Sequence, residues 1–186
     1  MATPKSIGAI ELSSIALGFQ VQDAMLKAAE IEILVARTIC SGKYFLVFAG
    51  TVNDVKAALS AGLAAPEEAV IDHVALPNVH ESVFPALGQS VLVGEEEPGA
   101  LGVLETYSGV SILAAADAAA KAANVKLLRI HVAMALGGKG YCLMTGTVGD
   151  CRAAVAAGAA VARQRGLLVN EVTIPRPRKE LLSEYF

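Results

Sequence analysis

The sequence predicts two tandem α+β domains, each a ferredoxin-like antiparallel sheet with helices on one face, and three observations support this fold class. The segment 7–62 recurs in altered form as 101–158. In each copy, short apolar runs and helix-period segments follow the order β-α-β-β-α-β. The apolar content of 54% is more than two small cores can bury, which indicates extensive subunit interfaces.

The first copy contains six predicted elements. Continuous apolar and β-branched runs predict strands at 7–12, 33–35, 44–48 and 70–76. Small and apolar residues at helical spacing predict helices at 20–30 and 54–61. Thr51 or Asn53 can cap the second helix, and Gly62 suits its end.

The second copy repeats this order with a small change of spacing. Strands are predicted at 100–105, 127–132, 141–146 and 167–174, and helices at 111–123 and 148–164. Glu11, Asp23 and Lys27 have counterparts 94 residues later, at Glu105, Asp117 and Lys121. The counterpart of Gly50 is Gly146, which lies 96 residues later. The second copy has therefore gained two residues, which we place where 128–133 replaces 34–37.

A charged and turn-rich segment, Gly94 to Gly99, separates the copies and suits an exposed linker. We therefore predict a first domain at 1–94, a linker at 95–99 and a second domain at 100–186. The first residues lack the apolar stretch of a secretory signal, and no apolar run reaches the roughly 18 residues that a membrane helix needs. These features predict a cytoplasmic protein without a membrane partner.

Charge and cysteine spacing exclude further classes of function. A net charge of −3 with no basic run argues against nucleic-acid binding. Three cysteines without CxxC spacing argue against a disulfide framework and a structural zinc site. Glu11 and Glu105 recur with no second carboxylate, nucleophile or histidine beside them in sequence, and the Gly-Gly-Lys-Gly segment at 137–140 lacks the phosphate-loop pattern. We therefore expect a protein that is not an enzyme.

Four motifs carry a resemblance to a known family. They are Gly-Val-Leu-Glu-Thr at 102–106, Ala-Ala-Asp-Ala with Lys-Ala-Ala-Asn-Val within 115–125, Gly-Thr-Val-Gly-Asp at 146–150 and Ile-Pro-Arg-Pro-Arg at 174–178. In order and spacing they resemble the bacterial microcompartment shell domain, present twice and unpermuted. The resemblance implies a homotrimeric, pseudohexameric facet tile with a central pore, which assembles with other shell proteins in the microcompartment shell.

The resemblance also assigns two pore loops. In the first copy these residues are Thr38, Ile39, Cys40, Ser41 and Gly42, and in the second Leu136, Gly137 and Gly138. Related tandem proteins with such a cysteine loop bind a [4Fe-4S] cluster. Threefold symmetry would bring three Cys40 thiolates together, leaving the fourth iron to water or a small thiol. Ser41 departs from the pattern, because proline stands there in those relatives and would hold the loop more rigidly.

The cluster would transfer electrons across the shell or be delivered to redox enzymes inside, which would then be partners. One alternative is a metal-free tile whose pore conducts a small metabolite. A third reading, from another class, is a trimeric ferredoxin-like sensor of a small molecule. Cys142, Cys151 and the three histidines are interpreted as ordinary strand, core or surface residues.

Three basic residues match positions that lie at the tile edge in the family. Lys27 and Lys121 stand at equivalent places in the two copies, and Arg176 lies between two prolines. A solvated helix lysine is the alternative interpretation for the first two. The first copy has Asn78 after its proline instead of an arginine, so alternating edges of one tile are expected to differ.

Overall fold

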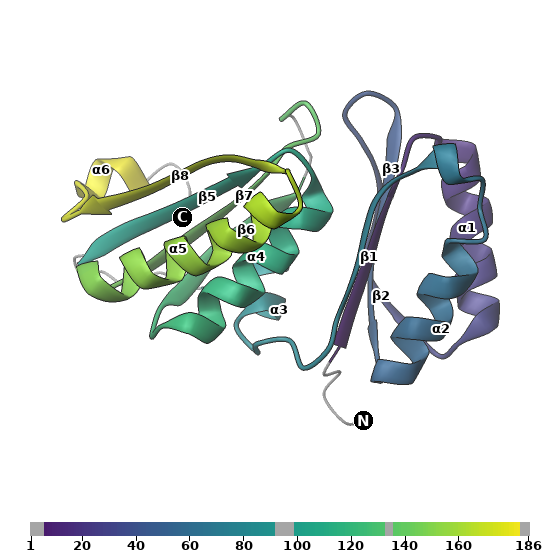
Figure 1. The fold of residues 1–186 in the computed structure, drawn as a ribbon, viewed down its shortest axis with the longest axis horizontal. Helices are drawn as coiled ribbons and strands as arrows, with labels where there is room; N and C mark the ends of the chain where they lie inside the picture. Colours follow the sequence, from purple (N-terminus) through teal and green to yellow (C-terminus); the bar gives the residue numbers. More distant parts are fainter. Residues whose placement is uncertain (1–5, 92–98, 133–135, 183–186) are drawn as a thin grey trace. The chain divides into compact units, whose positions relative to one another are not determined.

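Each copy of the repeat folds into a four-stranded antiparallel sheet with two long helices (Figure 1). The computed structural model describes residues 6–91, 99–132 and 136–182. The strand orders β2-β3-β1-β4 and β6-β7-β5-β8 are equivalent, since each copy places its first strand between its third and fourth. This topology confirms the predicted α+β, ferredoxin-like fold class.

The first domain differs from the prediction mainly at the start of its first helix and at the end of its second strand, which includes the predicted pore-loop residues Thr38 and Ile39. Its elements are β1 (Ser6–Leu12), α1 (Ile15–Ala28), β2 (Glu32–Ile39), β3 (Lys43–Gly50), α2 (Val52–Gly62), a 3-10 turn (Glu67–Ala69) and β4 (Val70–Leu76). Helix α1 begins five residues before the predicted 20–30, because the Ser14 hydroxyl accepts a hydrogen bond from Leu17 N–H at 3.4 Å. Thr51, one of the two predicted caps, accepts from Asp54 N–H and starts α2.

The second domain follows the prediction closely. Its elements are β5 (Ala100–Thr106), α4 (Gly109–Ala122), β6 (Lys126–Val132), β7 (Gly140–Gly146), α5 (Val148–Gln164) and β8 (Leu168–Pro175). Helix α5 has the predicted bounds, and Thr147 caps it as Thr51 caps α2. Two short helices were not predicted: α3 (Val83–Leu87) and α6 (Lys179–Leu182). Each follows the last strand of its copy.

Strand pairing places the two extra residues of the second copy elsewhere than the sequence alignment did. Thr38 pairs with Tyr44, and the equivalent Val132 pairs with Gly140. Both edge strands also carry a register shift at the same place, next to Ile33 and Leu127. The two edge strands are therefore equivalent residue by residue as far as Val132. The prediction that the insertion lies within 128–133 is wrong for residues 128–132, which belong to the strand. The additional length lies in the turn that follows.

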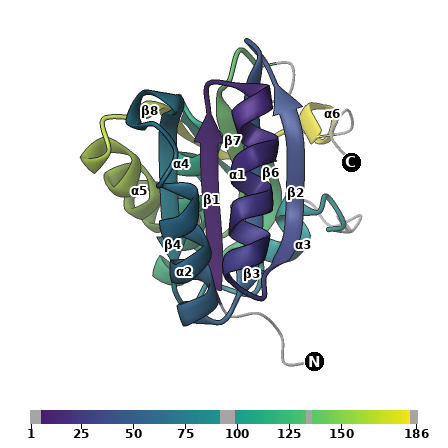
Figure 2. The same ribbon diagram turned by 90° about the vertical axis from the view of Figure 1, so that its right-hand side faces the viewer.

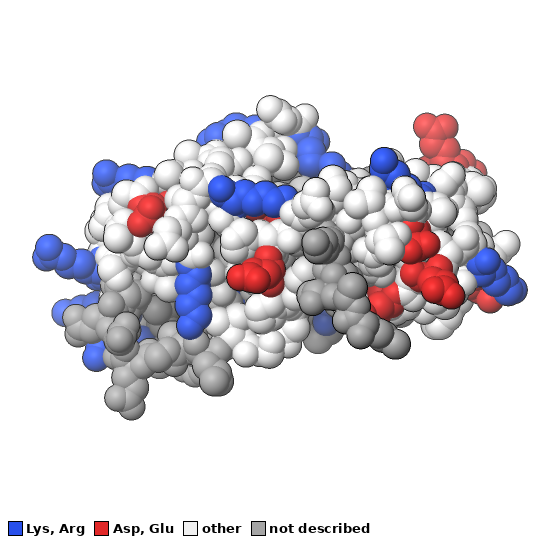
Figure 3. Space-filling model, turned by 90° about the horizontal axis from the view of Figure 1, so that it is seen from below, with Lys and Arg blue, Asp and Glu red and all other residues white. Residues whose placement is uncertain are grey.

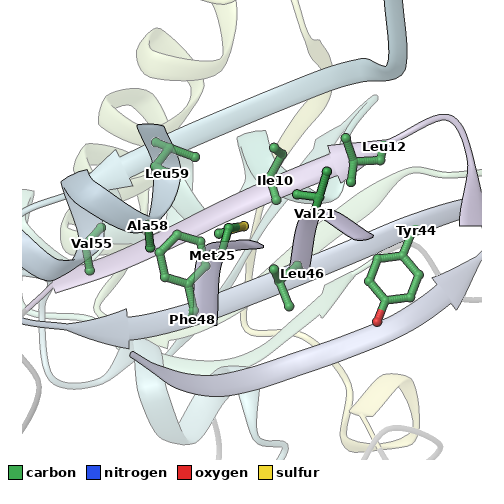
Figure 4. Packing of buried hydrophobic residues seen from close by; sticks show 10 residues of the cluster. All are labelled: Ile10, Leu12, Val21, Met25, Tyr44, Leu46, Phe48, Val55, Ala58 and Leu59. Carbon is green, nitrogen blue, oxygen red and sulfur yellow. The ribbon is translucent and has the colours of Figure 1, made fainter. Parts of the chain in front are cut away.

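The first domain has a well-packed core between its sheet and its helices. In Figure 2, α1 and α2 lie in front of the first sheet, and Figure 4 shows the side chains that fill the space between them. Ten buried residues form this cluster: Ile10, Leu12, Val21, Met25, Tyr44, Leu46, Phe48, Val55, Ala58 and Leu59. Gly8 is required at its position, since a Cβ there would lie 2.1 Å from Cζ of Phe48.

The contacts divide the chain into two units that follow the two copies closely. Residues 80–91, which include α3, group with the second copy. Most of the predicted linker, 95–98, lies outside the described residues, so the domain boundaries at 94 and 100 stay a prediction. Within 6–91, 99–132 and 136–182, every helix is too short or too polar to cross a bilayer.

Candidate functional site: the two hairpin turns

The turn between β2 and β3 holds the cysteine that the sequence singled out. Ile39 pairs with Lys43, so Cys40, Ser41 and Gly42 form a three-residue turn at the tip of the hairpin. Ser41 has φ +67° and Gly42 has φ +72°, both in the left-handed region. Proline is locked near −65°, so it could not take the Ser41 conformation of this turn. A chain with proline at this position would therefore need a different local backbone.

Cys40 differs in surroundings from the other two cysteines. It is half-buried at the turn tip, whereas Cys142 and Cys151 are completely buried. Burial raises the pKa of the Cys142 thiol to about 12. Burial and the nearby Asp150 charge raise the pKa of Cys151, against a smaller opposing effect of a hydrogen bond with the Gly102 backbone. Both buried thiols thus stay protonated near neutral pH and behave as core residues.

A metal site cannot be assembled from one copy of the described chain. Across residues 6–91, 99–132 and 136–182, no three side chains of His, Cys, Asp or Glu lie close enough together to hold a metal ion. Cys40 is the single cysteine at a turn tip, so one chain offers one thiolate there. Any cluster at this position therefore needs thiolates from further copies of the chain.

The corresponding turn of the second copy contains no cysteine. It connects β6 to β7, and its described residues Leu136, Gly137 and Gly138 offer no metal-binding side chain. Gly137 has φ +63° and Gly138 has φ +91°, conformations that glycine adopts without strain. Residues 133–135 lie outside the described residues. The two turns that the family resemblance assigns to the pore thus differ in length and in chemistry.

An ion pair lies at the base of each turn, and sequence reasoning missed both. Lys43 Nζ lies 2.9 Å from Glu11 Oε1, and Lys139 Nζ lies 3.0 Å from Glu105 Oε1. The lysine follows the turn and the glutamate stands on the central strand of the same sheet. The recurrence of both residues at matched positions was the available signal, but the partners are 32 and 34 residues apart in sequence. These pairs join each turn to the middle of its sheet.

The residue three positions before Cys40 is a further cation at the hairpin base. Arg37 lies opposite Phe45, and burial lowers its pKa. The equivalent residue of the second copy is His131, whose ring stacks on that of Tyr141 with centroids 5.1 Å apart. Each hairpin base thus combines a basic residue with an aromatic one.

The predicted edge residues occupy equivalent positions but differ in surroundings. Lys27 and Lys121 lie in the last turns of α1 and α4, and each pairs with the aspartate four residues before it. The Lys27 pair is exposed to water, whereas the aspartate that holds Lys121 is buried. Arg176 is exposed after β8 with φ +46°. On the face shown in Figure 3, basic and acidic side chains alternate with uncharged surface.

Comparison with known proteins identifies the family. The model of the BMC domain matches residues 6–79 and again 100–177. The chain is 41% identical over 177 residues to the bacterial microcompartment shell protein PduT of Citrobacter freundii, covering 95% of each chain. A crystal structure of a microcompartment protein from Desulfitobacterium hafniense superposes with a TM-score of 0.86 at 40% identity, covering 96% of this chain and 98% of that one.

A more distant structure, a fused permuted hexameric shell protein from the RMM microcompartment, matches with a TM-score of 0.63 at 26% identity, covering 85% of this chain and 81% of that one. All three are microcompartment proteins, which favours the shell reading over the small-molecule sensor. None of these similarities tests the roles predicted for Cys40, the two turns or the basic edge residues. The chain belongs to the BMC-domain family and is a structural shell protein of a bacterial microcompartment with two tandem BMC domains.

Proposed function

We propose that three copies of this chain form a tile of six BMC domains around a central pore. We further propose that three Cys40 thiolates at this pore hold a [4Fe-4S] cluster, which transfers electrons across the shell. The observation that carries the proposal is the position of Cys40, a half-buried thiol at the tip of a hairpin turn in one of two otherwise equivalent domains.

The unequal burial of equivalent sheet faces supports the trimer. Ala9 and Phe45 of the first sheet are fully buried, whereas the equivalent Val103 and Tyr141 of the second sheet remain half-buried. The helices show the opposite difference, because α4 is more buried than α1. Each chain therefore has two unlike open surfaces, one on each domain. Unlike surfaces of this kind join copies head to tail, and a closed ring of three such chains contains six domains.

The chemistry of the three cysteines supports Cys40 as the ligand. Iron–sulfur clusters are held by thiolates, and a buried thiol with a raised pKa is a poor source of one. Cys142 and Cys151 are excluded on that ground. Three copies of Cys40 would supply three thiolates, and water or a small external thiol would complete the set. When bound, such a cluster supplies one-electron transfer.

The residues around the turn would fix the position of the Cys40 thiolate. Lys43 begins β3 directly after the turn, and its ion pair with the buried Glu11 ties the turn to the central strand. Redox enzymes inside the compartment would be the partners that give or accept electrons.

The first test measures iron and acid-labile sulfide per trimer after anaerobic reconstitution, together with the absorption spectrum. We expect about four irons per trimer in the wild type and none in Cys40→Ala. Cys151→Ala is the matched control, because it removes a buried thiol and should keep the iron. A trimeric wild type without iron would leave the metal-free pore for a small metabolite as the better function.

The proposed tile edges can be tested separately from the cluster. The double variant Lys27→Ala with Lys121→Ala should form trimers but no extended sheets under the electron microscope, whereas Lys56→Ala, an exposed lysine of α2, should form both. Both edge lysines are exposed in the chain, but Lys121 pairs with the buried Asp117, so urea unfolding must confirm that the double variant keeps its fold. Loss of the trimer in the double variant would show that these lysines do not lie at the tile edge.

A further inference from the structure

The segments that follow the last strand of each copy are equivalent in sequence but not in surroundings. Leu76 pairs with Ile7, and Ile174 pairs with Leu101, so the two strands β4 and β8 end in register. Continuing from there, His80 corresponds to Arg178 and Val83 corresponds to Leu181. The first segment forms α3 and the second forms α6. Each copy thus ends in a short helix with an apolar residue at the same place.

The segment from the first copy is docked within the second unit. Helix α3 packs against β6 (Figure 1), and Val83 is 0% exposed. Just before the helix, the His80 N–H donates a hydrogen bond to Asp117 Oδ1 at 2.8 Å. The other oxygen of Asp117 accepts from Lys121. This docking site therefore consists of one aspartate on α4 and the outer edge of β6.

The equivalent docking site of the first domain is open. Asp23 corresponds to Asp117, yet its side chain is 61% exposed instead of 8%. On the edge strand, Ala36 of β2 is exposed where the equivalent Ile130 of β6 is buried. The C-terminal segment is correspondingly undocked, since Leu181 is 46% exposed. The second domain thus has an occupied docking site, the first domain has the equivalent site open, and the C-terminal segment of the same chain is undocked.

We propose that the C-terminal segment of one copy, Arg178 with helix α6, docks on Asp23 and β2 of the next copy. The Arg178 N–H takes the place of the His80 N–H and donates to the Asp23 carboxylate. Leu181 takes the place of Val83 and packs on β2. A second copy is the occupant because the same chain already shows this contact between equivalent residues. The inference rests on the trimer proposed above.

This contact would act on the candidate site. Strand β2 ends at Ile39, directly before Cys40. As an edge strand it pairs with β3 alone, so its outer side depends on what covers it. The segment from the neighbouring copy would cover β2 and hold the strand that carries the Cys40 turn. Each copy would then stabilise the cluster ligand of the next.

Disulfide trapping tests the contact directly. In a Cys40→Ser background, the pair Asp23→Cys with Arg178→Cys should form disulfides between chains on mild oxidation, giving covalent dimers and trimers on a non-reducing denaturing gel. The pair Asp117→Cys with His80→Cys is the matched control. Its two positions are joined by a hydrogen bond in one chain, so its disulfide should leave the mass of a single chain.

Native mass measured on the same samples separates this inference from the proposed function. A trimer whose control pair oxidises, but whose 23/178 pair stays reduced or closes within one chain, overturns the docking contact and leaves the trimer intact. A wild-type chain that is monomeric at all concentrations overturns the trimer itself, and the docking contact with it.

Hydrogen exchange gives a second readout that needs no new thiols. Leu181→Asp should speed amide exchange in β2 by about tenfold in the trimer, since burial of one leucine side chain contributes a free energy of that order. Leu63→Asp, which places the same charge on another exposed leucine, should leave β2 unchanged. Equal exchange of β2 in the two variants would contradict the contact.

Discussion

Helices α1 and α4 occupy the same position in equivalent domains, yet one is open to water and the other is buried. Phe19 of α1 is 61% exposed, and the equivalent Leu113 of α4 is 0% exposed. Ile15 and Leu26 extend the exposed stripe on α1, while α4 carries buried alanines along most of its length. Large exposed apolar residues that follow one helix face mark an interaction surface. Duplication has therefore kept the fold and changed the surroundings of the equivalent helix faces.

A charge at the buried position of α4 should have the largest effect. Leu113→Asp places a carboxylate among apolar side chains, so we expect the free energy of unfolding to fall by about 4 kcal/mol or more. Phe19→Asp should change the stability of the folded chain little and should instead weaken the proposed trimer. Urea unfolding and native mass measure the two effects. Similar stability losses in both variants would show that the two helix faces have equivalent surroundings.

The ion pairs at the two hairpin bases are equivalent in position but differ in burial. The Glu11 side chain is 0% exposed, and that of Glu105 is 35% exposed. Removing one partner of a buried pair leaves the other charge uncompensated, so Glu11→Gln should cost about 3 kcal/mol. Glu105→Gln should cost less than about 1 kcal/mol, because water screens the more exposed pair.

Urea unfolding of these two variants gives the comparison, and high salt provides a control. Raising the ionic strength should reduce the effect of Glu105→Gln and leave most of the effect of Glu11→Gln, since salt screens exposed charges more than buried ones. If the two variants lose equal stability with equal salt dependence, the hairpin bases do not differ in burial.

The sequence was sufficient to predict the repeat, the fold class and most elements, because these depend on local periodicity and on the internal duplication. The start of α1 at Ile15 was missed although Ser14 is a good cap, since the apolar period was counted from Gln20. Helices α3 and α6 were missed because each is shorter than two turns and gives no periodic signal.

The contacts of the candidate site could not be predicted in the same way. The Glu11–Lys43 pair needs the register between two strands, which the sequence does not show. The place of the two extra residues likewise depended on strand pairing. The roles of Cys40, Lys27, Lys121 and Arg176 came from family resemblance, and these stay predictions, because pore and edge are properties of several copies rather than of one chain.

The smallest expected effect concerns the residues after the last strands. Arg176 and the equivalent Asn78 both have left-handed backbone, with φ +46° and +49°. Asparagine tolerates this region, whereas arginine pays about 1 kcal/mol for it. We therefore expect Arg176→Asn to raise the free energy of unfolding by about 0.5–1 kcal/mol, measured by urea unfolding. The reciprocal Asn78→Arg should lower it by a similar amount.

Strain of this kind persists where a side chain has a use that the isolated chain does not show. If Arg176 lies at the tile edge, Arg176→Asn should be more stable as a chain and worse at forming extended sheets, as seen by electron microscopy. A variant that gains stability and still forms sheets would show that Arg176 does not contribute to the tile edge. A variant that gains no stability would mean that Arg176 adopts the left-handed conformation without strain, so its backbone would give no indication of a role at the edge.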